Sequence, residues 1–258
     1  MKIGIVGCQG RVGSLLVQEL LSGTHGNLEL AGGTVLPEHL DAAKNEGFFV
    51  TDSAEELFDR ADLIIDFTIP EATREHIQLA AQTGTKYIIA TTGLTSDDER
   101  TITNAAQNAP IIYSANMSIA VTILDALVEK TAAALGDDFD IEIVEAHHKH
   151  KIDAPSGTAI MLGRTAANAR DLSFDDHAVL SREGITGARK DNEIGFSTIR
   201  GADVVGEHTV YFLGNGERLE LKQQATNRAL YAKGALTAAK WLAEKPSGLY
   251  SMRDVLGL

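Results

Sequence analysis

The first half of the sequence alternates short apolar runs with longer amphipathic stretches. The apolar runs predict strands at residues 2–6, 28–30, 63–67, 86–90 and 111–114, and the amphipathic stretches predict helices at residues 11–21, 71–82 and 96–108. Strands that are apolar at nearly every position are buried on both faces, which happens when helices cover both sides of a parallel sheet. The alternation therefore predicts a doubly wound, Rossmann-type α/β domain.

The pattern changes after about residue 116. Helices are predicted at residues 119–135 and 227–242, a strand at 140–145, and runs of alternating polar and apolar residues at 195–200, 207–213 and 217–224. Gly214, Asn215 and Gly216 between the last two runs are typical of a hairpin turn, so the alternating runs are expected to pair antiparallel. This half predicts a second α+β domain built on a mixed or antiparallel sheet.

The two patterns together predict where the domains divide. Residues 1–118 are expected to form a dinucleotide-binding domain, to which the C-terminal residues 227–258 return. Residues 119–226 are expected to form a separate substrate-binding domain.

Three glycines, Gly7, Gly10 and Gly13, lie where the first predicted strand passes into the first predicted helix. A glycine-rich turn at this place lets the backbone approach a pyrophosphate, and the helix N-terminus supplies N–H donors and a favourable dipole. The alternative is a tight strand–helix turn that binds no ligand. Its position at the start of an alternating α/β pattern favours a nicotinamide dinucleotide site.

The end of the second predicted strand bears on which dinucleotide is bound. An acidic residue here usually receives the adenosine ribose hydroxyls. Residues 32–36 contain no carboxylate, and the next one is Glu38. The missing acid favours NADPH over NADH, because nothing repels a ribose 2′-phosphate. Arg11 is either the partner of that phosphate or a solvated residue on the first helical turn.

Charge and cysteine content exclude several classes of protein. The 23 basic and 36 acidic residues give a net charge of −13, which repels nucleic acid and anionic lipid. Cys8 is the only cysteine, so neither an internal disulfide nor a cysteine metal cluster can form. No apolar run approaches the roughly 20 residues that span a bilayer. We expect a cytoplasmic protein without nucleic-acid or membrane partners.

Residues 147–151 gather three of the eight histidines and two lysines. Such a run is either a solvated basic loop, a metal site or a site for an anionic substrate. The ligand spacing that zinc usually requires is missing, so no metal is expected. The run follows an apolar strand and leads into Pro155, Ser156, Gly157 and Thr158, which look like a helix start whose N–H groups could bind a carboxylate. In an acidic protein this is the positive site that an anionic substrate would need.

The string AHHKHKIDAPSGTA at residues 146–159 closely resembles the signature of the 4-hydroxy-tetrahydrodipicolinate reductase family. Other stretches agree in order along nearly the whole chain: GCQGRVG, IDFTIPEAT, ATTGL, SANMS, SREGITGAR, IGFSTIRGADVVGEHTV and SGLYSMRDVL. The resemblance implies NAD(P)H-dependent reduction of a cyclic imine dicarboxylate in diaminopimelate and lysine biosynthesis, by a homotetramer whose second domain also carries the subunit contacts.

The resemblance also implies roles for particular residues. His147 would be the proton donor and acceptor, and Lys151 a second proton donor. The substrate would be held by His148, Gly157 and Thr158. The cofactor would be contacted by Gly7, Cys8, Gln9, Gly10, Arg11, Val12, Ala90, Thr91, Thr92, Ser114, Ala115, Asn116 and Met117.

Three positions depart from the family pattern. Ala90 replaces a glycine, the acid after the second strand is missing, and Thr122 stands where asparagine is common. Two other functions remain open. One is a Rossmann-type reductase of a different imine or keto acid, and the other is an NAD(P)-sensing regulator, which would leave the His/Lys cluster unexplained.

Overall fold

A computed structural model describes residues 1–43 and 46–258 of the chain. These residues form two compact units. The first unit comprises residues 1–119 together with 229–258, and the second comprises residues 120–228.

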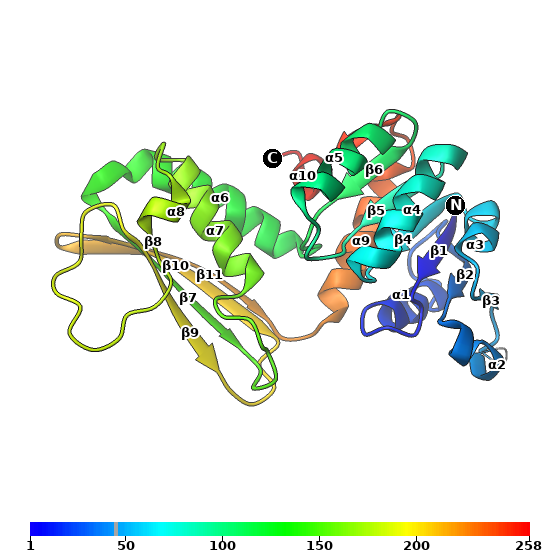
Figure 1. Ribbon diagram of the computed structural model, residues 1–258, viewed down its shortest axis with the longest axis horizontal. Helices are drawn as coiled ribbons and strands as arrows, with labels where there is room; N and C mark the ends of the chain where they lie inside the picture. Colours follow the sequence, from blue (N-terminus) through cyan, green and yellow to red (C-terminus); the bar gives the residue numbers. More distant parts are fainter. Residues whose placement is uncertain (44–45) are drawn as a thin grey trace. The chain divides into compact units, whose positions relative to one another are not determined.

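The first unit is built on a parallel sheet of seven strands in the order β12-β6-β5-β4-β1-β2-β3 (Figure 1). Every neighbouring pair in this sheet runs parallel. The strands are β1 (Lys2–Val6), β2 (Glu29–Thr34), β3 (Val50–Thr51), β4 (Leu63–Asp66), β5 (Lys86–Ile89), β6 (Pro110–Tyr113) and β12 (Gly248–Tyr250).

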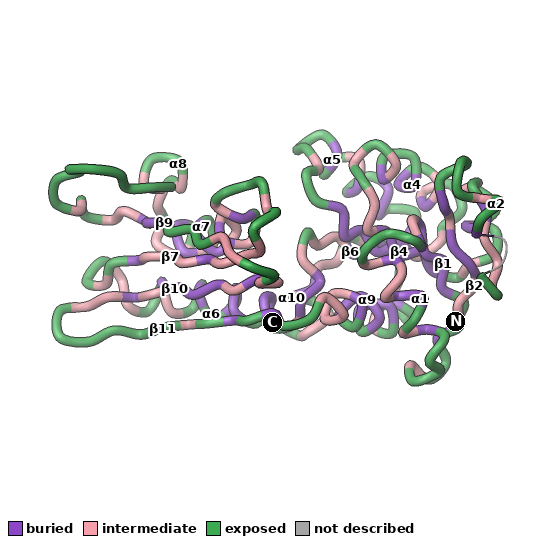
Figure 2. The backbone as a smooth tube through the Cα atoms, turned by 90° about the horizontal axis from the view of Figure 1, so that it is seen from below, coloured by how far each residue is buried: buried purple, intermediate pink, exposed green. Residues whose placement is uncertain are grey.

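Helices cover both faces of this sheet. They are α1 (Gly13–Leu21), α2 (Leu40–Ala43), α3 (Ala54–Arg60), α4 (Pro70–Thr83), α5 (Ser96–Ala105), α9 (Ala229–Leu242) and α10 (Met252–Leu256), with the 3-10 turn η1 (Pro37–His39). Along β4, Leu63 and Ile65 pack into a core with α1 and α9, whereas Ile64 packs into a second core with α3, α4 and α5. The buried stretches of β1 and β4 stand out in Figure 2. The prediction of a doubly wound α/β fold is confirmed.

The boundaries of several elements differ from the predicted ones for local reasons. Helix α1 begins at Gly13, two residues later than expected, because residues 7–12 form the glycine turn. Strand β2 extends to Thr34, since it pairs with β3 through Gly33 and Thr34. The short elements η1, α2, β3, α3, β12 and α10 were not predicted from the sequence.

The second unit is built on a mixed sheet in the order β11-β10-β7-β9-β8. Its strands are β7 (Asp140–His147), β8 (Ala178–Val179), β9 (Ile194–Arg200), β10 (Gly206–Gly214) and β11 (Glu217–Ala225). Its helices are α6 (Ile119–Leu135), η2 (Gly136–Asp138), α7 (Gly157–Asn168) and α8 (Phe174–His177).

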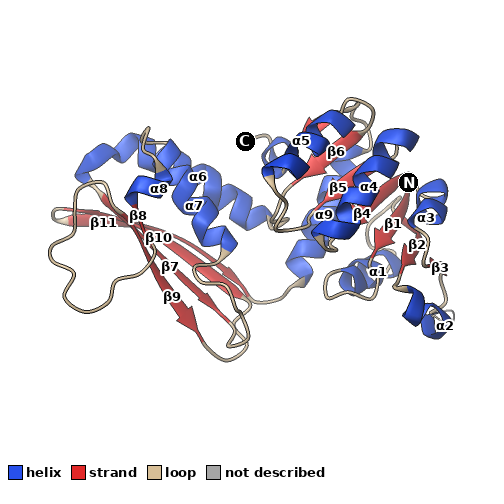
Figure 3. Cartoon of the chain, viewed as in Figure 1, coloured by secondary structure: helices blue, strands red, loops and turns tan. Residues whose placement is uncertain are grey.

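Helices α6 and α7 lie on one face of this sheet (Figure 3), and their side chains pack into its core. Leu124 and Val128 of α6 and Leu162 of α7 join Ile143 and Phe212 in one buried core. The predicted α+β unit with a mixed sheet is thus confirmed.

One strand pairing was predicted wrongly. β10 pairs antiparallel with β11, as expected, and it also pairs antiparallel with β7, a pairing that was not predicted from the sequence. β9 instead runs parallel to β7, with Glu145 opposite Thr198 and His147 opposite Arg200. The long segment between β7 and β9, which contains α7, returns the chain to the same end of the sheet and so allows a parallel pair. No helix within the described ranges is long and apolar enough to cross a membrane.

Candidate active site

The glycine turn after β1 has the backbone geometry of a phosphate loop. Gly7 has φ +69°, a conformation that side chains disfavour. A Cβ added to Gly13 would lie 2.2 Å from the Gly7 carbonyl oxygen, so only glycine fits where α1 begins. Val12, at the N-cap of α1, makes no side-chain hydrogen bond to the helix start within the described chain. Ser14 N already donates to the Gly10 carbonyl oxygen at 2.9 Å, so the tight glycine turn and the dipole of the helix N-terminus are what fit this loop to a dinucleotide.

The predicted cofactor residues of this loop differ in whether their side chains are exposed to a cofactor. Gln9, Gly10 and Arg11 are exposed, and the Gln9 amide donates to Glu46 Oε1 at 2.8 Å. Cys8 is buried, and burial, followed by the nearby Glu46 carboxylate, raises its pKa to about 11. Cys8 is therefore a neutral thiol at neutral pH, and only its backbone can face a cofactor.

The other predicted cofactor residues follow β5 and β6, which are neighbours in the sheet. The residues after these strands are Ala90, Thr91 and Thr92, and Ser114, Ala115, Asn116 and Met117. Because β1, β4, β5 and β6 are parallel, these residues and the glycine turn lie along the same carboxyl edge, where open α/β sheets bind their ligands.

Asp66, at the end of β4, holds this edge together and was not singled out from the sequence. Its buried carboxylate accepts hydrogen bonds from Thr68 Oγ1 at 2.6 Å, His76 Nδ1 at 2.8 Å and Tyr87 OH at 2.5 Å. Burial alone would raise the pKa of Asp66, but these donors, led by His76, lower it. Thr91 Oγ1 lies 3.3 Å from the same carboxylate, so the Thr91 side chain is committed to this network.

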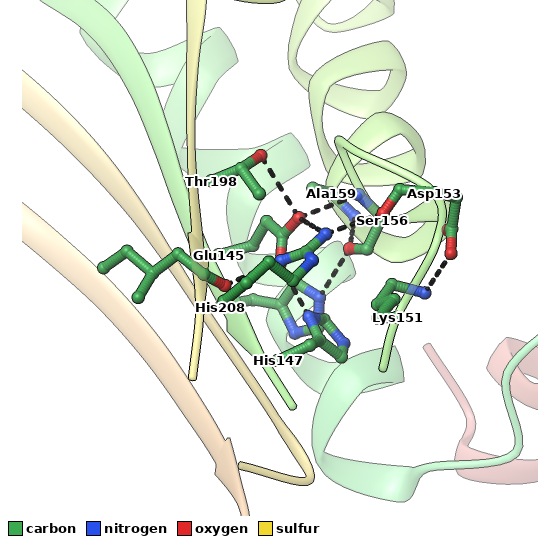
Figure 4. A network of polar contacts seen from close by, with 10 residues as sticks. Glu145, His147, Lys151, Asp153, Ser156, Ala159, Thr198 and His208 are labelled. Carbon is green, nitrogen blue, oxygen red and sulfur yellow. Dashed lines mark hydrogen bonds and ion pairs between the residues drawn. The ribbon is translucent and has the colours of Figure 1, made fainter. Parts of the chain in front are cut away.

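In the second unit, the predicted proton-transfer residues lie at the end of β7 and in the loop that follows it. His147 Nδ1 is 2.6 Å from Glu145 Oε2, and the His147 ring contacts the His208 ring edge-on with a centroid distance of 5.2 Å. Lys151 Nζ is 2.8 Å from Asp153 Oδ1. Figure 4 shows these side chains together with Ser156. Within the described ranges, no group of three His, Cys, Asp or Glu side chains could hold a metal ion.

Two of the predicted substrate-binding residues, Gly157 and Thr158, lie at the start of α7. Ser156 caps the helix, accepting a hydrogen bond from Ala159 N, and Gly157 and Thr158 form the first turn. The pKa of His148 is lowered, first by burial and then by the positive charge of Arg228. The helix N-terminus and the nearby His/Lys cluster together form a site suited to a carboxylate.

Several residues of this site were missed in the sequence. Arg200 donates to both oxygens of Glu145, at 2.7 and 2.8 Å, and Ser156 N donates to the same carboxylate at 3.1 Å. Ser156 Oγ lies 3.0 Å from His208 Nε2. One signal could have revealed Glu145: it continues the inward alternation of Ile141 and Ile143 along β7, where a charged residue is unexpected.

We expect His208 to make the folded protein less stable in acid. Burial, and then the charge of His147, lower the pKa of His208 from 6.5 to about 4. Between these two pH values, His208 binds a proton in the unfolded chain but stays neutral in the folded chain. The free energy of unfolding therefore falls as pH drops from 6.5 toward 4. The full difference is about 3 kcal/mol.

Urea unfolding followed by circular dichroism at pH values on either side of this window tests the expectation. His208→Gln, which keeps an amide near Ser156, should lose most of the acid-dependent decrease. The exposed His150→Gln control should retain it. An unchanged pH dependence in His208→Gln would show that other groups cause the destabilisation.

Both halves of the chain match models of one protein family. The model described as dihydrodipicolinate reductase, N-terminus, matches residues 1–117, and the model described as dihydrodipicolinate reductase, C-terminus, matches residues 120–256.

Individual relatives give the same result. A 4-hydroxy-tetrahydrodipicolinate reductase from Sulfurovum sp. is 46% identical over 257 residues, covering 100% of this chain and 99% of the relative. The enzyme of that name from Burkholderia multivorans is 43% identical over 264 residues and covers both chains completely. A dipicolinate-bound dihydrodipicolinate reductase structure from Paenisporosarcina sp. TG-14 is 25% identical, with a TM-score of 0.76 and 97% coverage of each chain. The chain belongs to the dihydrodipicolinate reductase family.

Proposed function

We propose that this chain reduces 4-hydroxy-tetrahydrodipicolinate to tetrahydrodipicolinate with NAD(P)H, a step of diaminopimelate and lysine biosynthesis. The observation that carries the proposal is the match of both family models, which together span both structural units. The same family name applies to the cofactor-binding half and to the substrate-binding half. This disfavours a protein that shares only the fold of the family and has a different activity.

The reaction divides between the bound cofactor and the side chains of the second unit. Loss of water from the substrate leaves a conjugated imine, and the nicotinamide, when bound, supplies a hydride to the far end of that conjugation. The nitrogen end then needs a proton and stabilisation of its charge. His147 exchanges this proton, and Lys151 supplies a second proton or positive charge near the carboxylates.

The start of α7 holds a substrate carboxylate in this proposal. Gly157 and Thr158 form the first turn of a helix whose dipole favours an anion at its N-terminus. His148 contributes a further contact. Lys151, now paired with Asp153, would exchange that partner for the substrate.

We expect Thr158→Val to raise the apparent KM for the substrate, because a hydroxyl donor to the carboxylate is lost. Thr158→Ser retains the hydroxyl and should keep a KM close to that of the unmodified protein. Steady-state kinetics at saturating cofactor measure both values. A KM unaffected by valine would mean that the carboxylate is bound elsewhere.

NADPH is the preferred cofactor in this proposal, held by the glycine turn and by the residues after β5 and β6. The residue at the end of β2 is Thr34 rather than an acid, and its hydroxyl accepts a hydrogen bond from Gly7 N at 3.0 Å. It therefore presents no negative charge to a ribose 2′-phosphate. Arg11, exposed on the glycine turn, is the proposed partner of that phosphate.

Two substitutions should move cofactor preference in a predictable direction. Arg11→Ala should weaken NADPH binding more than NADH binding, because only NADPH carries the extra phosphate. Thr34→Asp should favour NADH by adding a partner for the ribose hydroxyls and repelling the phosphate. The next residue, Val35, follows the end of β2, but its side chain is buried in the core. Thr34 is therefore the better position for an introduced acid.

Dissociation constants of both cofactors for each variant provide the measurement, with the surface substitution Arg100→Ala as control. Equal losses for both cofactors in Arg11→Ala would assign Arg11 to the shared pyrophosphate. A strong NADH preference in the unmodified protein would contradict the inference that a missing acid at the end of β2 favours NADPH.

We also propose an oligomeric state and a cellular location for this enzyme. A homotetramer is expected from the family resemblance, with residues 120–228 supplying both the substrate site and the subunit contacts. We place the enzyme in the cytoplasm, consistent with a chain whose single cysteine cannot form an internal disulfide.

Product analysis tests the proposed activity against the two alternatives. Freshly prepared 4-hydroxy-tetrahydrodipicolinate should drive consumption of NADPH, with tetrahydrodipicolinate as the product. Faster reduction of a different imine or keto acid would identify another reductase. Cofactor binding without turnover of any such substrate would favour a regulator.

A further inference from the structure

The Glu145 carboxylate is a buried charge at the centre of the second unit's polar site. Its side chain is 1% exposed and accepts hydrogen bonds from four residues. Burying a carboxylate is costly unless it is paired and hydrogen-bonded. Burial alone would raise the pKa of Glu145, but hydrogen bonds from His147 and Arg200 bring it down to about 2. The group is therefore an anion at neutral pH.

This anion determines which nitrogen of His147 carries a proton. An ionised carboxylate only accepts hydrogen bonds, so the nitrogen 2.6 Å from Glu145 Oε2, which is Nδ1, must be the donor. In the neutral ring, Nε2 is then left with a lone pair. In the charged ring, Nε2 holds the proton that can be transferred.

The surroundings of His147 Nε2 are consistent with proton exchange at this nitrogen while Nδ1 donates to Glu145. Gly206 of β10 lies close to this nitrogen, and a Cβ added there would lie 3.1 Å from His147 Nε2. Any side chain at this position would crowd the nitrogen. The absence of one leaves space beside the atom that exchanges the proton.

Arg200 anchors the carboxylate and links it to the loop that carries Lys151. Its guanidinium donates to both Glu145 oxygens and, at 2.7 Å, to the carbonyl oxygen of Asp153. The side chain of Asp153 is in turn 2.8 Å from Lys151 Nζ. The paired guanidinium fixes the plane of the carboxylate, because both hydrogen bonds must be satisfied at once.

We propose that Glu145, held by Arg200, is the positioning residue that fixes the Nδ1–H tautomer and the orientation of His147. Glu145 acts through His147 and need not touch the substrate. The inference rests on the proposed function for the role of His147 in turnover, whereas the tautomer itself can be measured without any activity.

The unmodified protein provides the first test. Nitrogen-15 NMR of histidine-labelled protein, with His147 assigned by its absence in His147→Gln, reports the tautomer of the neutral ring. The proposal requires the Nδ1–H form. A neutral His147 ring in the Nε2–H form would overturn it, whether or not the protein reduces the proposed substrate.

Glu145→Gln tests the consequence for turnover. The amide can either donate or accept, so the ring is no longer restricted to one tautomer, and kcat should fall about 10²-fold. Cofactor affinity should stay unchanged and KM should change much less than kcat. Glu145→Asp keeps the charge and should restore part of kcat. Glu142→Gln is the matched control on the same strand, where Glu142 pairs with Arg182 instead, and it should keep both tautomer and kcat.

A double-mutant cycle separates positioning from a general structural role. If Glu145 acts through His147, adding Glu145→Gln to a His147→Gln background should cost little further activity. An equal loss of kcat in both backgrounds would overturn the proposal. Absence of turnover in the unmodified protein would count against the proposed function, while the NMR result would still decide the tautomer.

Discussion

Lys151→Ala should abolish measurable turnover while the affinity for NADPH stays nearly unchanged. Lys151 lies in the second unit, whereas the glycine turn that fits a dinucleotide lies in the first. Removing the ammonium group takes away a proton donor and positive charge near the substrate carboxylates, so we expect a loss of at least about 10²-fold in kcat/KM.

Steady-state NADPH consumption and a calorimetric dissociation constant for NADPH provide the two measurements. Lys149→Ala is the matched control, since Lys149 is an exposed lysine two residues away. Turnover of Lys151→Ala at the wild-type rate would refute its catalytic role. A parallel loss of NADPH affinity would instead indicate damage to the fold.

His147→Gln should lower kcat by about 10²-fold or more, the usual scale for a positioned acid or base. Glutamine can occupy much of the space of the imidazole and its amide can donate a hydrogen bond to Glu145, but it cannot exchange a proton near neutral pH. The loss should therefore appear in kcat rather than in cofactor binding.

The control for this substitution is His150→Gln, because His150 belongs to the same cluster but is exposed. Its kcat should match that of the unmodified protein. If His147→Gln also kept the unmodified rate and pH profile, His147 would have no part in proton transfer.

Much of the first unit could be predicted from the sequence because its elements carry strong local signals. Strands buried on both faces, such as β4, are apolar at nearly every position, and helices such as α4 show regular spacing. The elements that were missed in this unit have seven residues or fewer, α3 being the longest of them. β3 has two residues and β12 has three, so neither carries a pattern long enough to recognise.

The polar network of the second unit could not be predicted in the same way. Glu145 and Arg200 are 55 residues apart, and they meet only because β9 runs parallel to β7 with His147 opposite Arg200. The alternating pattern of β9 is equally compatible with antiparallel pairing, which is why that pairing was predicted wrongly. His208 reaches the same cluster from β10, whose register also depends on the assembled sheet.

The His/Lys cluster was recognisable because its residues are contiguous. Three histidines and two lysines at residues 147–151 are visible without any pairing information. The sequence did not indicate which residues orient them. That information lies in contacts between β7, β9 and the loop before α7, which form only when the unit folds.

The most direct test of the proposed reaction is the fate of the hydride. Freshly prepared 4-hydroxy-tetrahydrodipicolinate should be reduced with NADPH that carries deuterium at the transferring position of the nicotinamide, and the product examined by NMR and mass spectrometry. The proposed chemistry predicts one deuterium at the ring carbon that carried the hydroxyl group, which is the far end of the conjugated imine, together with loss of that hydroxyl. A product that retains the hydroxyl, or that carries deuterium at the carbon of the original imine bond, would contradict it.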